Sequence, residues 1–154
     1  MTSETIPIAS DHAGFELKAS LAARLLAMGY EVADLGTDSG DSTDYPDYAH
    51  PLARRVSDGE ARRGVLLCGT GLGMSYVANR YPGVRAAVAW SPEVAELARQ
   101  HNDANVLVLP ARFVGDDEAL RIMDAWLTTP FDGGRHERRV EKIERAATSA
   151  QGDA

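Results

Sequence analysis

Short apolar runs alternate with segments of helical periodicity along the chain. Residues 6–10 predict a buried strand, and residues 15–28 predict a helix whose apolar stripe stops at Gly29. The alternation then continues to residue 147. It predicts further strands at residues 30–35, 64–67, 84–90 and 105–109, and further helices at residues 49–57, 73–80, 92–100, 116–127 and 137–147.

Five strands that alternate with helices predict an α/β fold in which a parallel sheet is covered by helices on both faces. A length of 154 residues fits a single domain over residues 1–154, with residues 149–154 as a disordered tail. In folds of this kind, ligands bind beyond the carboxyl ends of the strands. The loops that follow strands are therefore where we look for chemistry.

The composition limits the partners that the chain can have. Its net charge is −7 at pH 7, which disfavours nucleic acid and anionic membranes. A single cysteine excludes an intrachain disulfide and a thiolate-rich zinc site. The first residues are too few and too polar for a signal peptide, and no apolar run is long enough to span a membrane. We expect a cytoplasmic protein that binds neither nucleic acid nor membranes.

The segment GVLLCGTGLGMS joins an apolar strand to a helix through a glycine-rich turn. Gly69, Gly71 and Gly73 let the backbone turn sharply and bring its N–H groups close to a ligand. The helix N-terminus behind them favours negative charge, either on a ligand or on a thiolate at Cys68. The segment lacks the third glycine of a dinucleotide fingerprint and the lysine of a P-loop. The alternative is that Cys68 is simply a small buried hydrophobic side chain.

Three further segments carry candidate side chains, each with a structural alternative. Asp11 and His12 follow the first strand and could contact a sugar hydroxyl or a phosphate, although a helix N-cap explains Asp11 equally well. His101 lies at a helix C-terminus, where an imidazole can donate a proton or merely complement the helix dipole. Arg135 and Arg139 share one helix face and suit a phosphate group, although pairing with nearby glutamates would also explain them.

The sequence predicts no metal site, no cofactor and no nucleophilic serine. Aspartates recur at every third position from Asp38 to Asp47, whereas an EF-hand loop needs oxygen ligands at every second position and a terminal glutamate. The four histidines are scattered, with no pair at helical ligand spacing. Ser75 lacks the G-x-S-x-G context of a nucleophile elbow.

Taken together and in order, several motifs resemble the ribose-5-phosphate isomerase B family, which also contains galactose- and allose-phosphate isomerases. The motifs are SDHAGFELK, TDYPDYA, LLCGTGLGMS, ANRYPGVRAA, ARQHNDANVL and DGGRHERRV. The resemblance extends over residues 6–145. It implies a three-layer α/β/α Rossmann-like sandwich with a five-stranded parallel sheet, and a homodimer or homotetramer with its site at the subunit interface.

The resemblance also implies roles for residues of this chain. Cys68 looks like the base that removes a proton beside the carbonyl, and His101 looks like the acid that helps to open the furanose ring. The turn that resembles the family's anion hole consists of Gly69, Thr70, Gly71, Leu72 and Gly73. The residues that resemble substrate or phosphate contacts are Asp11, His12, Asn102, Arg112, Arg135 and Arg139. Tyr76 departs from the family pattern, in which a smaller aliphatic residue is common.

The implied reaction is the interconversion of D-ribose 5-phosphate and D-ribulose 5-phosphate through an enediolate, without a cofactor or metal. A galactose or allose 6-phosphate or a tetrose 4-phosphate would suit the same chemistry, because pocket depth sets the choice of sugar. A non-catalytic sugar-phosphate sensor is the alternative from another class. The presence of both Cys68 and His101 counts against that alternative.

Overall fold

A single parallel sheet forms the centre of the molecule. The computed structural model describes the backbone of residues 3–152 and the side chains of residues 3–145. The strands are β1 (Thr5–Ser10), β2 (Glu31–Asp34), β3 (Gly64–Cys68), β4 (Ala86–Val88) and β5 (Val106–Pro110). All pairings are parallel, and the order across the sheet is β2-β1-β3-β5-β4. The predicted five-stranded parallel sheet is therefore confirmed.

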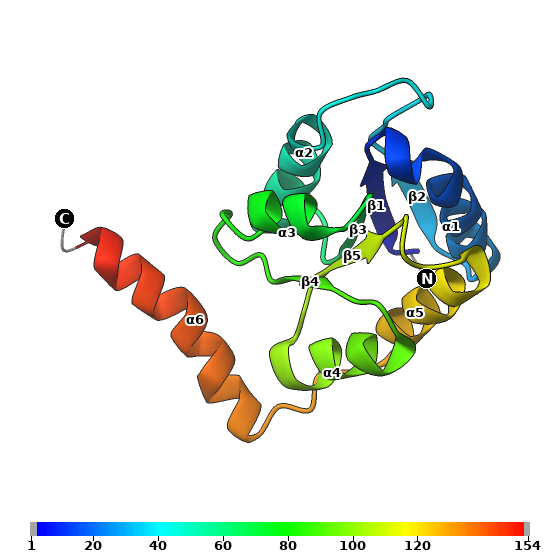
Figure 1. The fold of residues 1–154 in the computed structure, drawn as a ribbon. Helices are drawn as coiled ribbons and strands as arrows, with labels where there is room; N and C mark the ends of the chain where they lie inside the picture. The colour runs from blue at the N-terminus through cyan, green and yellow to red at the C-terminus, as the bar shows by residue number, and fades with distance from the viewer. Residues whose placement is uncertain (1–2, 153–154) are drawn as a thin grey trace.

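Helices cover both faces of this sheet and complete three layers (Figure 1). The helical segments are η1 (His12–Gly14), α1 (Phe15–Ala27), α2 (Pro46–Ser57), α3 (Leu72–Ala78), α4 (Pro92–Asn102), α5 (Asp116–Thr128) and α6 (Arg135–Gly152). Side chains of α1, α4 and α5 join one apolar core with the sheet, and side chains of α2 and α3 join the other. The predicted α/β/α sandwich is confirmed.

The central strands are buried on both faces. Leu67 and Leu109 belong to the core under α1 and α5, whereas their neighbours Leu66 and Val108 belong to the core under α2 and α3. A strand covered on both sides gains from apolar residues at every position. The continuous apolar run in β3, rather than an alternating pattern, follows from this position in the sheet.

The bounds of β4 and α2 show what apolar periodicity does not predict. β4 is shorter than the predicted 84–90, because it is an edge strand and side-chain amides bind part of its backbone. Asn105 Oδ1 accepts the N–H of Arg85 at 2.8 Å, and Asn79 Oδ1 accepts the N–H of Ala86 at 2.8 Å. α2 begins before the predicted residue 49, with Pro46 in its first turn, where proline's fixed φ suits a helix.

The last helix, α6, extends away from the sheet and the other helices (Figure 1). It was predicted over 137–147 and is longer at both ends, so residues 149–152 of the expected disordered tail are helical, and residues 153 and 154 lie outside the described part. Glu144 connects α6 to the body through Arg85 Nη1, at 3.1 Å. Within residues 3–152, no helix is both long enough and apolar enough to cross a membrane.

Candidate active site

The turn between β3 and α3 requires glycine at position 71. Gly71 has φ = +78°, a left-handed conformation, and a Cβ there would lie 3.2 Å from Val88 Cγ1 and 3.3 Å from Val108 Cγ1. This backbone directs the Gly71 N–H at Cys68 Sγ, with a distance of 3.2 Å. A sulfur at the strand end thus receives a hydrogen bond from the backbone of the following turn.

Cys68 is also part of the core between the sheet and α2–α3. Only 4% of its surface is exposed, and it belongs to the same apolar cluster as Leu66 and Met74. The expectation of a small buried side chain is therefore correct. Burial and reactivity are compatible here, because the Gly71 N–H would stabilise a thiolate more strongly than a neutral thiol.

Thr70 and Gly69, in the same turn, make contacts of their own. Thr70 is exposed, and its Oγ1 accepts the N–H of Leu72 at 3.2 Å. Arg112, which follows β5, lies over Gly69: a Cβ on that glycine would be 3.2 Å from Arg112 Nη1. The predicted turn residues and Arg112 therefore lie at one place.

Tyr45 is a neighbour of this turn that sequence reasoning missed. Its ring packs so closely on Gly73 that an added Cβ would lie 2.6 Å from two ring atoms. Tyr45 is the residue before α2 and is 39% exposed. Its place in the motif TDYPDYA was the only available signal, and that signal does not specify a contact with Gly73.

Asp11 and His12 lie beyond the end of the neighbouring strand β1. Asp11 caps η1, with Oδ1 accepting the N–H of Ala13 at 3.0 Å, so the expected N-cap is confirmed. His12 accepts the backbone N–H of Thr43 at Nδ1, at 3.1 Å. Because β1 and β3 are adjacent and parallel, these residues lie at the same edge of the sheet as Cys68.

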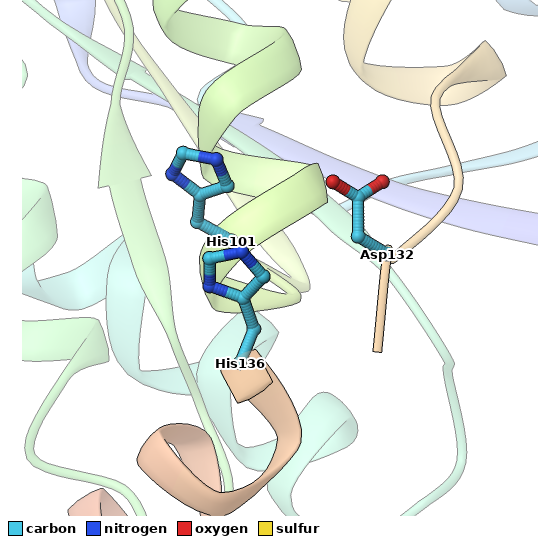
Figure 2. A group of neighbouring side chains, drawn as sticks. All are labelled: His101, Asp132 and His136. Atoms are coloured by element: carbon cyan, nitrogen blue, oxygen red, sulfur yellow. The ribbon is translucent and has the colours of Figure 1, made fainter. Parts of the chain in front are cut away.

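A second group of predicted residues gathers around the C-terminus of α4. The imidazoles of His101 and His136 are stacked, with centroids 4.4 Å apart and planes inclined by 11° (Figure 2). Asp132 lies beside them, and its backbone N–H donates to Gln100 O at 3.1 Å. His136 and Asp132 were missed because they reach His101 from a loop and helix distant in sequence.

The three side chains His101, Asp132 and His136 offer ligand atoms within 4.8 Å of one another. Their arrangement does not favour a cation. The lone pairs of two stacked imidazoles lie in nearly parallel planes and do not converge on one point. The guanidinium groups of Arg135 and Arg139 add positive charge beside His136. The cluster is better suited to an anion and to proton transfer.

Asn102, Arg135 and Arg139 lie with this second group. Arg135 and Arg139 are exposed on the first turns of α6. Among the side chains of residues 3–145, no carboxylate forms an ion pair with either arginine. The expected pairing with nearby glutamates is thus not observed for these two residues, and Glu144 instead binds Arg85.

The group around Cys68 and the group around His101 lie at opposite ends of the strands. Cys68 is at the carboxyl end of β3, where it is aligned with Pro110, the last residue of β5. His101 and Asn102 precede β5, and Asn105 O accepts the N–H of Gly64 at the start of β3. The length of β3 separates these ends by about 13 Å, at about 3.3 Å per residue. The structure therefore does not bring the two predicted catalytic residues together within one chain.

Residues 6–143 match the sequence profile of the Ribose/Galactose Isomerase family. The chain belongs to this family, so the resemblance and the isomerase class predicted from the sequence are confirmed. It is 49% identical over 138 residues to ribose-5-phosphate isomerase B of Escherichia coli K12, covering 90% of this chain and 93% of the relative.

Solved structures agree with this assignment. A ribose 5-phosphate isomerase from Thermotoga maritima has a TM-score of 0.90 and 56% identity, covering 94% of this chain and 99% of the other. A ribose-5-phosphate isomerase B from Mycoplasma genitalium with bound ribulose-5-phosphate has a TM-score of 0.92 and 44% identity, covering 96% and 99%.

Gly71→Ala tests the close packing of the turn. Gly59→Ala is the matched control, because Gly59 has φ = +82° but nothing within 4 Å of an added Cβ. Each substitution should lower the free energy of unfolding by about 1–2 kcal/mol, because alanine is strained in the left-handed conformation. Gly71→Ala should lose more in urea unfolding, since its methyl group meets Val88 and Val108. Equal losses would show that the turn has room for a side chain.

His136 should make stability depend on pH. Its side chain is largely buried, and burial lowers the pKa of His136. The positive charges of His101, Arg135 and Arg139 lower this pKa further, and the carboxylate of Asp132 raises it. The unfolded chain then binds a proton at a higher pH than the folded chain, so stability falls as pH decreases below about 6.5 and is flat above it for this group.

The check is a pair of unfolding series from pH 5 to pH 8, for the wild type and for His136→Asn. The loss of stability on acidification should be smaller in the variant, because the other titrating groups are common to both. An equal loss in the two proteins would mean that His136 is not held neutral by the fold.

Proposed function

We propose that this chain is an aldose–ketose isomerase that interconverts D-ribose 5-phosphate and D-ribulose 5-phosphate, with Cys68 as the base. The observation that carries the proposal is the hydrogen bond from the Gly71 N–H to Cys68 Sγ at the end of a parallel strand. Membership of the Ribose/Galactose Isomerase family supports the reaction class. The bound ribulose-5-phosphate of the Mycoplasma genitalium relative supports a pentose phosphate.

The first chemical step is removal of a proton from C2 of the open-chain aldose. The Cys68 thiolate takes this proton, and the electron pair moves onto the C1 carbonyl oxygen to form the enediolate. The same sulfur returns the proton to C1, while the hydroxyl proton of O2 passes to O1, which leaves the carbonyl at C2. The N–H of Gly71 donates to this sulfur and supports the negative charge that the base must hold.

The enediolate oxygen is held by backbone N–H groups of the turn from Gly69 to Gly73. The N–H groups of Gly71 and Leu72 already bind Cys68 Sγ and Thr70 Oγ1. We therefore assign the oxyanion contact to the remaining amides of this turn. Fixed backbone dipoles need no reorganisation when the charge develops, which is why such sites lower the barrier.

The acid and part of the phosphate site come from a second subunit. His101 is separated from Cys68 by the length of the sheet, so the two act together only if His101 of the partner subunit approaches the Cys68 turn. Arg135, Arg139 and Asn102 accompany His101 into that site. Asp11, His12 and Arg112 contact the substrate from the chain that contains Cys68. A homodimer is the smallest assembly that satisfies this arrangement, and a homotetramer built from such dimers also does.

The reaction needs no redox partner, since the substrate's hydrogen is only moved from one carbon to the next. A reducing cytoplasm suits this chemistry because it keeps the Cys68 thiol free.

The proposed activity is tested by NMR with the purified protein and a panel of pentose, tetrose and hexose phosphates. We expect ribose 5-phosphate and ribulose 5-phosphate to reach their equilibrium ratio from either side. Turnover of another sugar phosphate alone would refute the pentose assignment. A panel without any turnover would refute the isomerase proposal in favour of a sugar-phosphate sensor.

Cys68→Ala should abolish proton removal while substrate binding is largely kept, because the phosphate contacts are unchanged. General-base catalysis contributes roughly 10²–10⁴-fold, and loss of the sole base can exceed that. Solvent deuterium uptake at C2 of ribose 5-phosphate measures the step directly. Cys68→Ser is the matched control for size and should also be inactive, since a hydroxyl is far less acidic than a thiol. Exchange at the wild-type rate in either variant would exclude Cys68 as the base.

A further inference from the structure

The loop between β2 and α2 contacts His12 in a way that defines the proton position on its ring. Thr43 donates its backbone N–H to Nδ1 of His12 at 3.1 Å. A backbone N–H can only donate, so Nδ1 must present its lone pair. In the neutral ring the hydrogen is then on Nε2.

We propose that Thr43 is a positioning residue for substrate binding: its backbone N–H fixes His12 in the Nε2–H form, so that His12 serves as a hydrogen-bond donor to a substrate oxygen. This inference rests on the proposed function, because it needs a sugar phosphate at the Cys68 turn. In this form His12 offers a single N–H and no lone pair to the substrate. It therefore selects an acceptor oxygen and does not act as a base.

The loop is well placed to hold this hydrogen bond. Its first part continues alongside β1, where Ser10 N–H donates to Gly36 O and Thr37 N–H donates to Ser10 O, each at 2.8 Å. Its last part leads into α2 through Tyr45, whose ring packs on Gly73. The Thr43 amide is thus held between two anchored segments, and the ring of His12 is oriented relative to the glycine-rich turn.

The Thr43 side chain contributes little to this contact, which makes a clean control available. Its Oγ1 is buried and has no hydrogen-bond partner among the described residues. Thr43→Val removes this hydroxyl but keeps the N–H and the branched shape. Thr43→Pro removes the N–H itself. The two variants therefore separate the backbone contact from the side chain.

A second pair of variants tests the donor role of the ring. The amide nitrogen of glutamine can occupy the position of His Nε2, whereas the shorter asparagine reaches only the position of Nδ1. His12→Gln should bind ribose 5-phosphate more tightly than His12→Asn does. The expected difference is roughly tenfold to a hundredfold in Kd, the range for a hydrogen bond to a charged or strongly polar group.

The experiment is long-range ¹H–¹⁵N NMR of the histidine rings at neutral pH, assigned through His12→Gln, together with KM and kcat for each variant. In the wild type and in Thr43→Val, His12 should have the hydrogen on Nε2, and ribose 5-phosphate should shift that signal. In Thr43→Pro, with its fold checked by circular dichroism, the two tautomers should mix and KM should rise more than kcat falls.

An Nδ1–H tautomer in the wild type would overturn the proposal without any variant. An Nε2–H tautomer together with equal affinities of His12→Gln and His12→Asn would overturn the donor role. If the protein binds ribose 5-phosphate but does not isomerise it, the proposed function fails, while the tautomer and affinity results still decide the role of Thr43.

Discussion

The parallel pairing of β3 with β5 is the constraint on which the site depends. The register aligns Cys68 with Pro110 at the carboxyl ends of these strands and Gly64 with Val106 at their amino ends. A helix that connects two parallel strands runs antiparallel to them. The C-terminus of α4, with His101 and Asn102, therefore lies at the amino ends of the strands. The same covalent connections that build the fold therefore prevent one chain from holding the proposed base, Cys68, and the proposed acid, His101, together.

This constraint gives a physical reason for the proposed oligomer. Two chains can provide opposite edges to one site, and twofold symmetry then makes two identical sites at once. α6 extends away from its own sheet with Arg135 and Arg139 exposed on its first turns, as a helix that reaches another chain would (Figure 1). In the proposed oligomer, each subunit would bring His101, Arg135 and Arg139 to the Cys68 turn of its neighbour.

Much of the fold was accessible from the sequence because burial leaves a pattern. The apolar runs of β3 and β5 and the stripe of α1 specify a parallel sheet with helices on both faces. The start of β4 was placed too early, since the side chain of Asn105 binds the N–H of Arg85 just before the strand, and no apolar pattern records that. Cys68 and the glycine turn were found because chemistry and backbone conformation coincide in one segment.

Other parts of the site could not be found in this way. The stack of His101 on His136 joins residues from two helices, and the packing of Tyr45 on Gly73 joins the residue before α2 to the first turn of α3. Both contacts depend on tertiary structure rather than on spacing along the chain. The opposite positions of Cys68 and His101 were implicit in the order of strand and helix, since one is the last residue of β3 and the other precedes β5.

Complementation between inactive subunits tests the two-chain site most directly. Cys68→Ala and His101→Asn are each expected to be inactive, and subunit exchange in an equal mixture should restore about a quarter of wild-type activity, one intact site in each mixed dimer. A double variant, Cys68→Ala with His101→Asn, mixed equally with wild type should leave about a quarter of the activity if sites are shared and about half if each chain has its own site. No recovery in the first mixture, with exchange verified by native mass spectrometry, would contradict the account.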